Sequence, residues 1–315
     1  MNLRFFSVKL FRALITLLLV VTFAFVILRL SGDPVEILLG DDIDQATLQH
    51  YRELYGLDRP LPEQYLRYFG GIARGDLGFS LADERAVTTV IAEAVPATLL
   101  LGFTALLISL AVGVPLGIIA ALNRNKAIDR FVMTFAVLGF SIPNFFLGIL
   151  LILLFSLWLR WLPSSGMGTI WHLIMPAVTL GLSSAGSLAR FTRSSMLDVL
   201  NRSYVRTAVA KGVPRLRRIV LHALPNAAIP LVTVLGFRLG DLIAGAIVIE
   251  TVFAWPGVGR LLVSAVSARD LAVVQGVLLM TAVTMVTANL LVDLLYGWID
   301  PRIRTSGNDP RGGHA

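Results

Sequence analysis

Four long stretches of this 315-residue chain contain no charged residue, and they restrict its possible folds more than any other feature. They run from Glu93 to Arg124, from Arg130 to Arg160, from Arg160 to Arg190 and from Asp270 to Asp293, and enclose 30, 29, 29 and 22 residues. A helix needs about 20 apolar residues to cross roughly 30 Å of hydrocarbon. Each stretch therefore predicts one transmembrane helix.

A further span, the first along the chain, is predicted near the N-terminus. Arg12 and Arg29 enclose only 16 uncharged residues, and the basic residues before them also fit the start of a signal peptide. No A-x-A cleavage pattern follows, however, and Arg29 can extend its charge to the membrane interface. We therefore favour an uncleaved helix that spans Phe11–Leu30, and not a signal peptide.

Another span, the fifth of six along the chain, is predicted over 219–249, although this stretch contains two charges. Arg238 and Asp241 are three residues apart, so they share one helical face and can pair inside the membrane. The pair fits either a polar solute pathway or a structural contact with a partner subunit, and both interpretations stay open.

The composition agrees with a membrane protein and excludes several kinds of site. The chain is 56% hydrophobic and 15% charged, whereas soluble domains are near ~25% charged. It has no cysteine, which excludes disulfides, cysteine-bound metals and thiol nucleophiles, and its four histidines form no close pair. We predict no metal, no cofactor and no catalytic residue.

The distribution of charge predicts the orientation. Of 27 basic residues, 17 fall in the short segments at the two ends and after the second and fourth spans. Positive charge gathers on the cytoplasmic side, so both termini are predicted to be cytoplasmic. The overall charge of +7 therefore reflects topology, and we expect no nucleic-acid partner.

Residues 31–95 form the one large segment predicted outside the membrane. They hold 12 of the 20 acidic residues and five arginines, a net charge of −7. Helical patterns around Gln45–Tyr55 and Glu63–Ile72, with turns at the following glycines, favour a small folded cap over a linker. The predicted division is an N-terminal tail and first helix (1–30), an acidic outer loop (31–93), a core of helices 2–6 (94–297) and a cytoplasmic tail (298–315).

The loop at 190–224 is predicted to contain two short helices around a glycine turn. A helix rich in small residues, namely Thr207, Ala208 and Ala210, is predicted from Tyr204 to Lys211. Gly212 can adopt the positive φ that ends this helix, and Pro214 prevents its continuation. A basic helix then leads to Leu224 and Pro225. A compact knob of this kind allows close approach of another protein.

At these residues the chain resembles the coupling loop of binding-protein-dependent ABC importer permeases, E-A-A-x-x-x-G-x(9)-I-x-L-P. Arg206-Thr207-Ala208 takes the E-A-A position, and Gly212 and Leu224-Pro225 match the rest of the pattern. Arg206, Thr207 and His222 depart from it. The R-T-A-x-A-K-G form is similar to the dipeptide/oligopeptide/nickel branch. Further matches occur in order along the chain: GDP at 32–34, YGLDRPLPEQY at 55–65, GDLGFS at 75–80, SIPNFFLG at 141–148, ETVFAWPGVG at 250–259 and LLYGWIDPRIR at 294–304.

The resemblance implies an all-α type I importer permease with six transmembrane helices. It implies a heterodimer with a second permease, two ATPases on the coupling loops and an extracytoplasmic binding protein that delivers the solute. The chain has no G-x-x-x-x-G-K-[ST] motif and so no nucleotide loop of its own. The expected solutes are peptides, with nickel, glutathione and other small solutes as alternatives.

Further residues are candidates for the pathway or its gate. A proline inside the third span is expected to kink the helix and to leave one backbone carbonyl without its helical partner. The kink fits a break that lines the solute pathway and ordinary packing between helices about equally well. A glycine-rich run at 113–117 favours close packing. The candidates are Ser141, Pro143, Asn144, Arg238, Asp241, Glu250, Pro256 and Gly257.

Two other classes of function are weighed against this interpretation. A secondary transporter would work without an ATPase and often contains an inverted repeat, and the sequence has no convincing repeat. A membrane-embedded enzyme would need clustered catalytic side chains in its spans, and none is evident.

Overall fold

The computed structural model describes residues 3–30, 44–54, 56–80, 82–228, 230–231 and 246–299. The chain divides into two compact units. One is built mainly from Leu99–Trp255, and the other from Leu3–Thr98 and Pro256–Val286. Most of the predicted fifth span, with Arg238 and Asp241, lies outside the described residues, as do the GDP segment and the C-terminal tail from residue 300.

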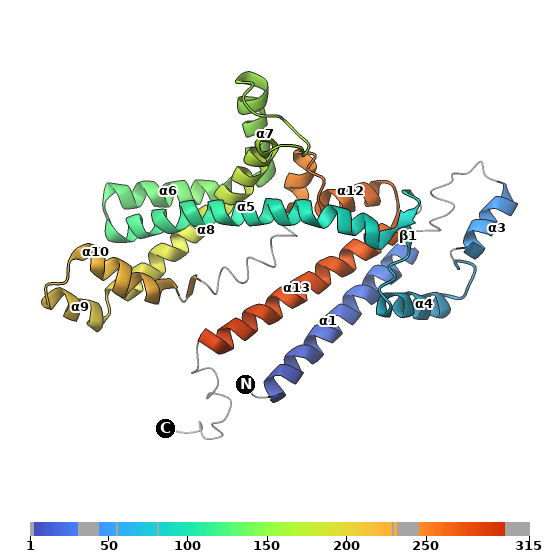
Figure 1. The fold of residues 1–315 in the computed structure, drawn as a ribbon, viewed down its shortest axis with the longest axis horizontal. Helices are drawn as coiled ribbons and strands as arrows, with labels where there is room; N and C mark the ends of the chain where they lie inside the picture. The colour runs from blue at the N-terminus through green and yellow to red at the C-terminus, as the bar shows by residue number, and fades with distance from the viewer. Residues whose placement is uncertain are drawn as a thin grey trace. The chain divides into compact units, whose positions relative to one another are not determined.

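The described residues are almost entirely helical (Figure 1). The unit containing the N-terminal helix has α1 (Leu3–Leu30), α3 (Gln45–Leu54), α4 (Leu61–Ala73), the paired strands β1 (Phe79–Ser80) and β2 (Arg85–Ala86), and α12 (Val258–Ser267). The other unit has α6 (Ala127–Ser141), α7 (Asn144–Leu151), η1 (Ile152–Trp158), α8 (Ile170–Leu200), α9 (Ser203–Ala210), α10 (Arg215–Arg217) and η2 (Arg218–Ala223). Helices α5 (Val87–Leu122) and α13 (Leu271–Ile299) each contribute residues to both units.

Four described helices are long and apolar enough to cross a membrane, and a bent pair raises the number to five if it counts as one span. The four lie at Ser7–Ile27, Val87–Leu122, Ile170–Leu200 and Leu271–Leu291. They match the first, second, fourth and last predicted spans. The N-terminal prediction of a single long helix is therefore confirmed at the level of secondary structure.

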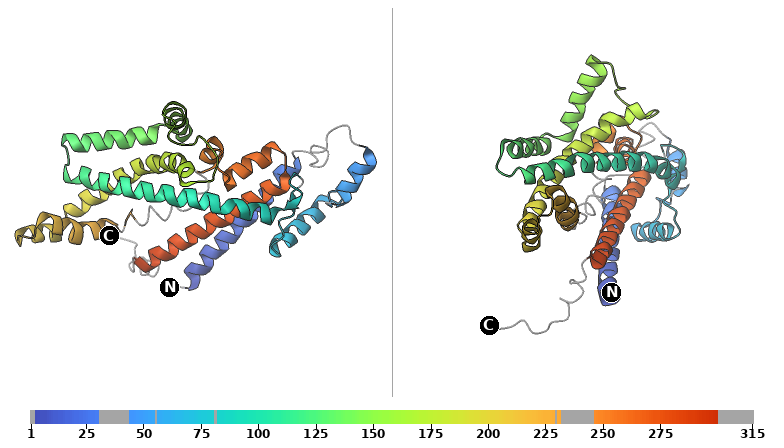
Figure 2. Two further views of the ribbon diagram at one scale, coloured as in Figure 1. Left: turned by 45° about the horizontal axis from the view of Figure 1, so that its top comes forward. Right: turned by 60° about the vertical axis from the view of Figure 1, so that its left-hand side comes forward.

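The predicted third span is interrupted by more than a kink. The helical segments Ala127–Gly139 and Asn144–Trp158 are bent by 97° relative to each other. The change of direction between α6 and α7 can be followed in Figure 2. Steric conflict with a proline ring pushes the preceding residue out of helical geometry. Ile142 is accordingly extended (φ −81°, ψ 121°), and α7 restarts after Pro143, whose carbonyl accepts the Leu147 N–H at 3.1 Å.

Helix α8 is closely packed against α5 and α6 through glycines. A Cβ added at Gly117 of α5 would lie 2.5 Å from the carbonyl oxygen of Ala189 and from Thr192 Cβ. A Cβ at Gly186 of α8 would lie 2.5 Å from the carbonyl oxygen of Ala136 on α6. Small residues allow helix backbones to approach in this way in membranes. The packing predicted for the 113–117 run is confirmed.

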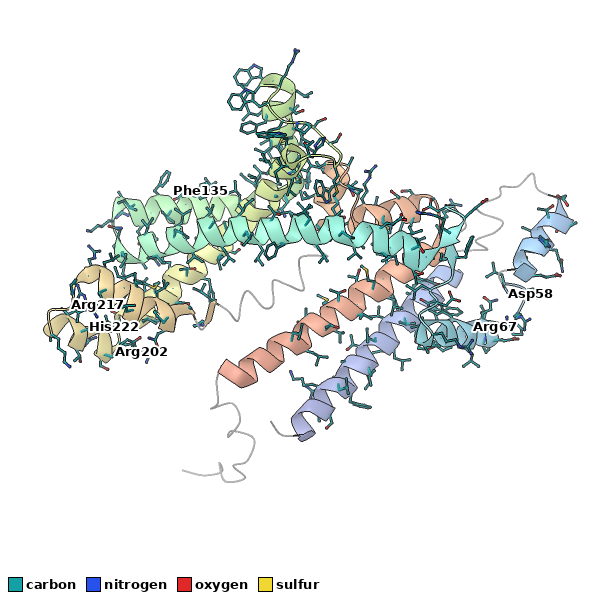
Figure 3. All side chains as sticks on the ribbon, in the orientation of Figure 1. Asp58, Arg67, Phe135, Arg202, Arg217 and His222 are labelled. Atoms are coloured by element: carbon teal, nitrogen blue, oxygen red, sulfur yellow. The ribbon has the colours of Figure 1, made fainter. Side chains whose placement is uncertain are left out.

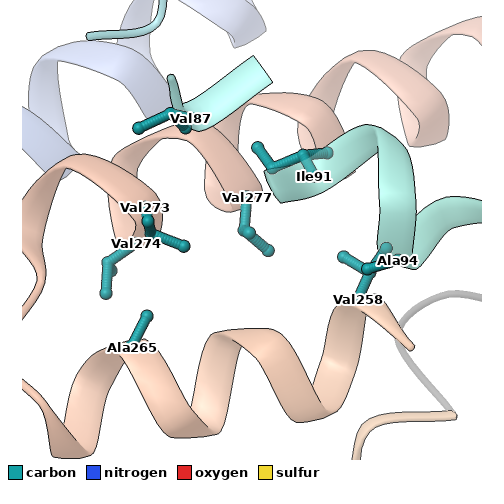
Figure 4. Close-up of a cluster of buried hydrophobic side chains, with 8 residues drawn as sticks. All are labelled: Val87, Ile91, Ala94, Val258, Ala265, Val273, Val274 and Val277. Carbon is teal, nitrogen blue, oxygen red and sulfur yellow. The ribbon is translucent and has the colours of Figure 1, made fainter. Parts of the chain in front are cut away.

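The second unit has an apolar core shared by three helices (Figure 4). It contains buried side chains from the start of α5, from α12 and from the start of α13: Val87, Ile91, Ala94, Val258, Ala265, Val273, Val274 and Val277. Gly276 allows this contact, because a Cβ there would lie 2.5 Å from Val87 Cγ1.

The acidic segment after α1 has folded structure of its own. The residue ranges of helices α3 and α4 agree, to within two residues at each end, with the two predicted helical patterns. Phe25 of α1 packs its ring against Tyr65 and Tyr68 of α4, with ring centroids 5.3 and 5.9 Å apart. Burial raises the pKa of Tyr68 to about 12. The Tyr65 hydroxyl also hydrogen-bonds with Thr22 Oγ1 at 2.7 Å. These contacts fix α4 to one end of the first helix.

The G-D-L-G-F-S motif attaches this segment to α13. Ser80 and Asp270 are both buried, and the Ser80 hydroxyl donates to Asp270 Oδ2 at 2.5 Å. The other carboxylate oxygen of Asp270 accepts the Val273 N–H at 3.2 Å and so caps the helix. Asp76 Oδ1 accepts the Gly78 N–H at 2.9 Å and closes the turn before β1. The motif is thus explained by a local turn at Asp76 and by the bond from Ser80 to Asp270, which is distant in the sequence.

Replacing Asp270 with alanine is expected to destabilise this unit by about 2–3 kcal/mol. The change removes a helix cap and leaves the buried Ser80 hydroxyl without its acceptor. The measurement is the apparent melting temperature of the purified protein in detergent. Asp83→Ala is the matched control, because its ion pair with Arg85 is exposed and long at 3.8 Å. Equal melting temperatures for the two variants would contradict this account of Asp270.

Candidate functional site

The predicted knob is formed by α9 and the turn that closes it. Helix α9 ends at Ala210, and Gly212 has a φ of +72°. The Gly212 N–H donates to the Val209 carbonyl at 2.9 Å, and the Val213 N–H donates to the Ala208 carbonyl at 3.1 Å. These two bonds are the Schellman arrangement, which satisfies the last carbonyls of a helix. The local geometry predicted for Gly212 is therefore present.

The knob has distinct inner and outer faces. Val205 and Ala208 are buried, being three residues apart on one face, while α9 contacts α8 and η2. The exposed side chains of α9 and its turn are Ser203, Tyr204, Arg206, Thr207, Val209, Ala210 and Lys211. The small residues of this helix were expected to allow close approach of another protein. The side chain of Ala208 instead packs against the chain itself. Figure 3 labels Arg202, Arg217 and His222 in this region.

The rest of the loop anchors the knob. Pro214 precedes α10 with a φ of −57°, which proline favours at a helix start. In η2, Ala223 is fully buried together with Ala121 of α5 and Met196 of α8, and Leu224 packs against this cluster. Pro225 is exposed. The L-P end of the motif therefore lies where the loop packs onto the helices that flank it.

Two predicted gate segments lie together in the unit that contains α8. Glu250 is fully buried in the helical segment 246–252, and the Trp255 N–H donates to its backbone carbonyl at 2.8 Å. Phe253, also buried, lies against Gly148 of α7, where an added Cβ would be 3.0 Å from its ring. The Phe253 carbonyl accepts the Gly166 N–H at 2.8 Å. The helix that begins at Asn144 is thus in contact with the segment that follows Glu250.

The remaining predicted residues have separate positions. Ser141 is exposed at the end of α6. Pro256 and Gly257 precede α12, and the Val258 N–H donates to Thr98 Oγ1 of α5 at 2.8 Å. This bond satisfies one of the free N–H groups at the start of α12. Arg238 and Asp241 lie outside the described residues.

An ion pair at the start of α6 was missed by sequence reasoning. Arg193 of α8 donates to both carboxylate oxygens of the buried Asp129, from Nε to Oδ1 at 2.6 Å and from Nη2 to Oδ2 at 2.7 Å. The Asn125 N–H also donates to Oδ2 at 2.8 Å. The charge pattern explains Arg193 only as one of the basic residues that orient the chain. A signal was present, since Asp129 is the only acidic residue between Glu93 and Asp198.

Among the described residues, no group of three or more histidine, aspartate or glutamate side chains could hold a metal ion. His172 belongs to a helix start, where its Nδ1 accepts the Thr169 N–H at 3.2 Å in a capping box with the threonine hydroxyl.

Comparison with known proteins gives the same picture. Residues 113–305 match the family "Binding-protein-dependent transport system inner membrane component", and residues 2–102 match its N-terminal membrane component. The glutathione transport system permease protein GsiC of Pectobacterium atrosepticum is 43% identical over 303 residues, which cover 96% of this chain and 99% of that protein. GsiC of Escherichia coli strain K12 is 44% identical over 275 residues, covering 87% and 90% of the two chains.

Solved structures share the fold at lower identity. A chain of the inward-facing MetNI methionine ABC transporter has a TM-score of 0.59 at 19% identity and covers 67% of this chain and 96% of its own length. An amino acid ABC transporter described with histidines has a TM-score of 0.53 at 17% identity, covering 67% and 94%. The chain therefore belongs to the family of binding-protein-dependent transport system inner membrane components, and it is a permease subunit of an ABC importer.

Proposed function

We propose that this permease imports peptides, and that glutathione, a modified tripeptide, is the first solute to test. Two relatives at 43% and 44% identity carry glutathione transport in their names. The resemblance of the coupling loop to the dipeptide/oligopeptide/nickel branch supports the same solute class. A nickel complex or another small solute is the second candidate.

The observation that carries the transport role is the exposed knob at α9. A short helix is closed by the Schellman turn at Gly212 and held to the chain by Val205 and Ala208, which leaves its opposite face exposed. A rigid projection of this kind suits a groove on an ATPase, so that nucleotide-driven closure becomes a movement of the attached helices. Two ATPases, one on this knob and one on that of a second permease, would hydrolyse ATP for the complex.

The proposed topology has six spans in a bacterial inner membrane with both termini cytoplasmic. The division is 1–30, 31–93, 94–297 and 298–315, with the acidic loop on the outer side. The folded α3–α4 segment there would meet the extracytoplasmic binding protein. The positive-inside rule and the four or five apolar spans among the described residues support this topology, and the remaining span is the one predicted over 219–249.

We propose that the pathway passes the break at Pro143 and the segment at Glu250. Ser141, Asn144, Arg238, Asp241, Pro256 and Gly257 would line it or shape its gate. The contact of α7 with Phe253 supports this placement. Helix α7, which begins at Asn144, and the segment that carries the buried Glu250 lie in one unit.

ATP-driven uptake by the reconstituted complex tests the proposal. The chain, its partner permease, the ATPases and the binding protein are placed in proteoliposomes, and uptake of glutathione, a dipeptide and a nickel chelate is measured. We expect peptide uptake that requires ATP and binding protein and is insensitive to proton and sodium ionophores. Uptake by the chain alone, driven by an ion gradient, would instead support a secondary transporter. ATP-driven uptake of nickel without peptide would favour the second candidate.

A further inference from the structure

The Asp129–Arg193 ion pair joins the two helices that separate the knob from the break at Pro143. Asp129 is in the first turn of α6, and α6 ends at Ser141, directly before the break. Arg193 is seven residues before the end of α8 at Leu200, and α9 begins at Ser203. The pair therefore lies near the end of α8 that continues to the knob.

The same two helices meet again further along. Ala136 of α6 lies against Gly186 of α8, and Gly139 of α6 lies against Leu182. Ala136 is seven residues after Asp129, and Gly186 is seven residues before Arg193, so the helices are antiparallel and in one register. We call this set of contacts the α6–α8 interface. Its ion pair is at one end, and its glycine contacts lead towards the break.

The chemistry of the pair suits positional control better than stability. Replacing a buried ion pair by apolar residues often leaves stability unchanged or higher, so a retained pair does not by itself indicate a gain in stability. An arginine bound through two nitrogens to one carboxylate fixes both distance and orientation. The Asn125 N–H, from a residue with φ of +65°, adds a third donor to the same carboxylate. This arrangement permits one register of α6 on α8.

We propose that the Asp129–Arg193 pair is a positioning element that makes α6 move with α8, so that displacement of the knob reaches the break at Pro143. The inference rests on the proposed function, in which an ATPase moves the knob. Beyond the break, α7 contacts Phe253 through Gly148. The described contacts thus form a continuous path from the knob to the segment of Glu250 within one unit.

The first test is the number of solute molecules transported per ATP in the reconstituted complex. Arg193→Lys keeps the charge but loses the paired geometry, and we expect transport per ATP to fall by about 5-fold to about 10-fold while ATP hydrolysis continues. A purely structural role would reduce the yield of assembled complex and leave transport per ATP unchanged. Arg130→Lys is the matched control, since Arg130 is exposed on the next position of α6. Wild-type transport per ATP in Arg193→Lys and in Asp129→Asn would overturn the proposal.

The second test does not require a solute. The chain contains no cysteine, so Leu138→Cys introduces one labelling site on α6 near the break, at a position that is 53% exposed. A spin label there is expected to change mobility when ATP and vanadate are added, and to lose that response when Arg193→Lys is also present. A response that survives Arg193→Lys would overturn the inference. Failure of peptide uptake with an intact label response would instead overturn only the assigned solute.

Discussion

Gly212→Pro is expected to abolish ATP-driven transport while the protein still inserts into the membrane. Gly212 has a φ of +72°, whereas proline is restricted to about −65°. Proline also removes the N–H that donates to the Val209 carbonyl at 2.9 Å. The turn that closes α9 cannot form, so the knob loses its shape. The measurement is recovery of the ATPase subunits when the permease is purified from membranes, together with uptake in proteoliposomes.

Gly212→Asn and Gly212→Ala distinguish conformation from steric contact. An added Cβ at this glycine would meet nothing within 4 Å, so only the backbone angle matters within the described part of the chain. Asparagine adopts the left-handed conformation more readily than alanine does. For alanine, this conformation costs about 1–2 kcal/mol of free energy. We expect near-normal ATPase recovery for Gly212→Asn and reduced recovery for Gly212→Ala. Normal recovery with Gly212→Pro would refute the role given to the knob.

Gly186→Ala is expected to destabilise the unit containing α8 by about 2–3 kcal/mol, although alanine favours helices over glycine by about 1 kcal/mol. The added methyl carbon would lie 2.5 Å from the Ala136 carbonyl oxygen, a backbone atom that cannot rotate away. The α6–α8 interface must separate to accept it. Thermal unfolding of the detergent-purified protein measures the loss.

Gly139→Ala is the matched control, because it makes the same substitution in the same interface. Its added carbon would lie 3.6 Å from the Leu182 carbonyl oxygen, which is an ordinary contact. We expect unchanged or slightly higher stability for this variant. If both substitutions lowered the melting temperature equally, a general intolerance of alanine would explain the result and close approach at Gly186 would not.

The coupling-loop residues show how far a motif can be interpreted. The turn at Gly212 was predictable, because glycine before a proline is a local signal that needs no distant partner. The inward face of Ala208 was not, because small residues are equally suited to contact with another protein and with the chain itself. The choice depended on where α8 and η2 lie beside α9.

The ion pair between Asp129 and Arg193 shows a second limit. The two residues are 64 positions apart. Each belongs to a basic segment whose charge is already explained by membrane orientation, so neither segment indicates a further role. Distance along the chain carries no information about which arginine meets the single acidic residue. Only the antiparallel packing of α6 on α8 selects Arg193 over its neighbours.

The sequence by itself determined that the chain is a helical membrane protein, because the transfer of apolar side chains out of water is a property of each segment alone. It also determined the family, through local motifs in order. The tertiary structure decided what each segment meets: the tie from Ser80 to Asp270, the pairing of Asp129 with Arg193, and the close approach at Gly186. These depend on pairs of residues distant in the sequence or on steric effects that residue composition does not express.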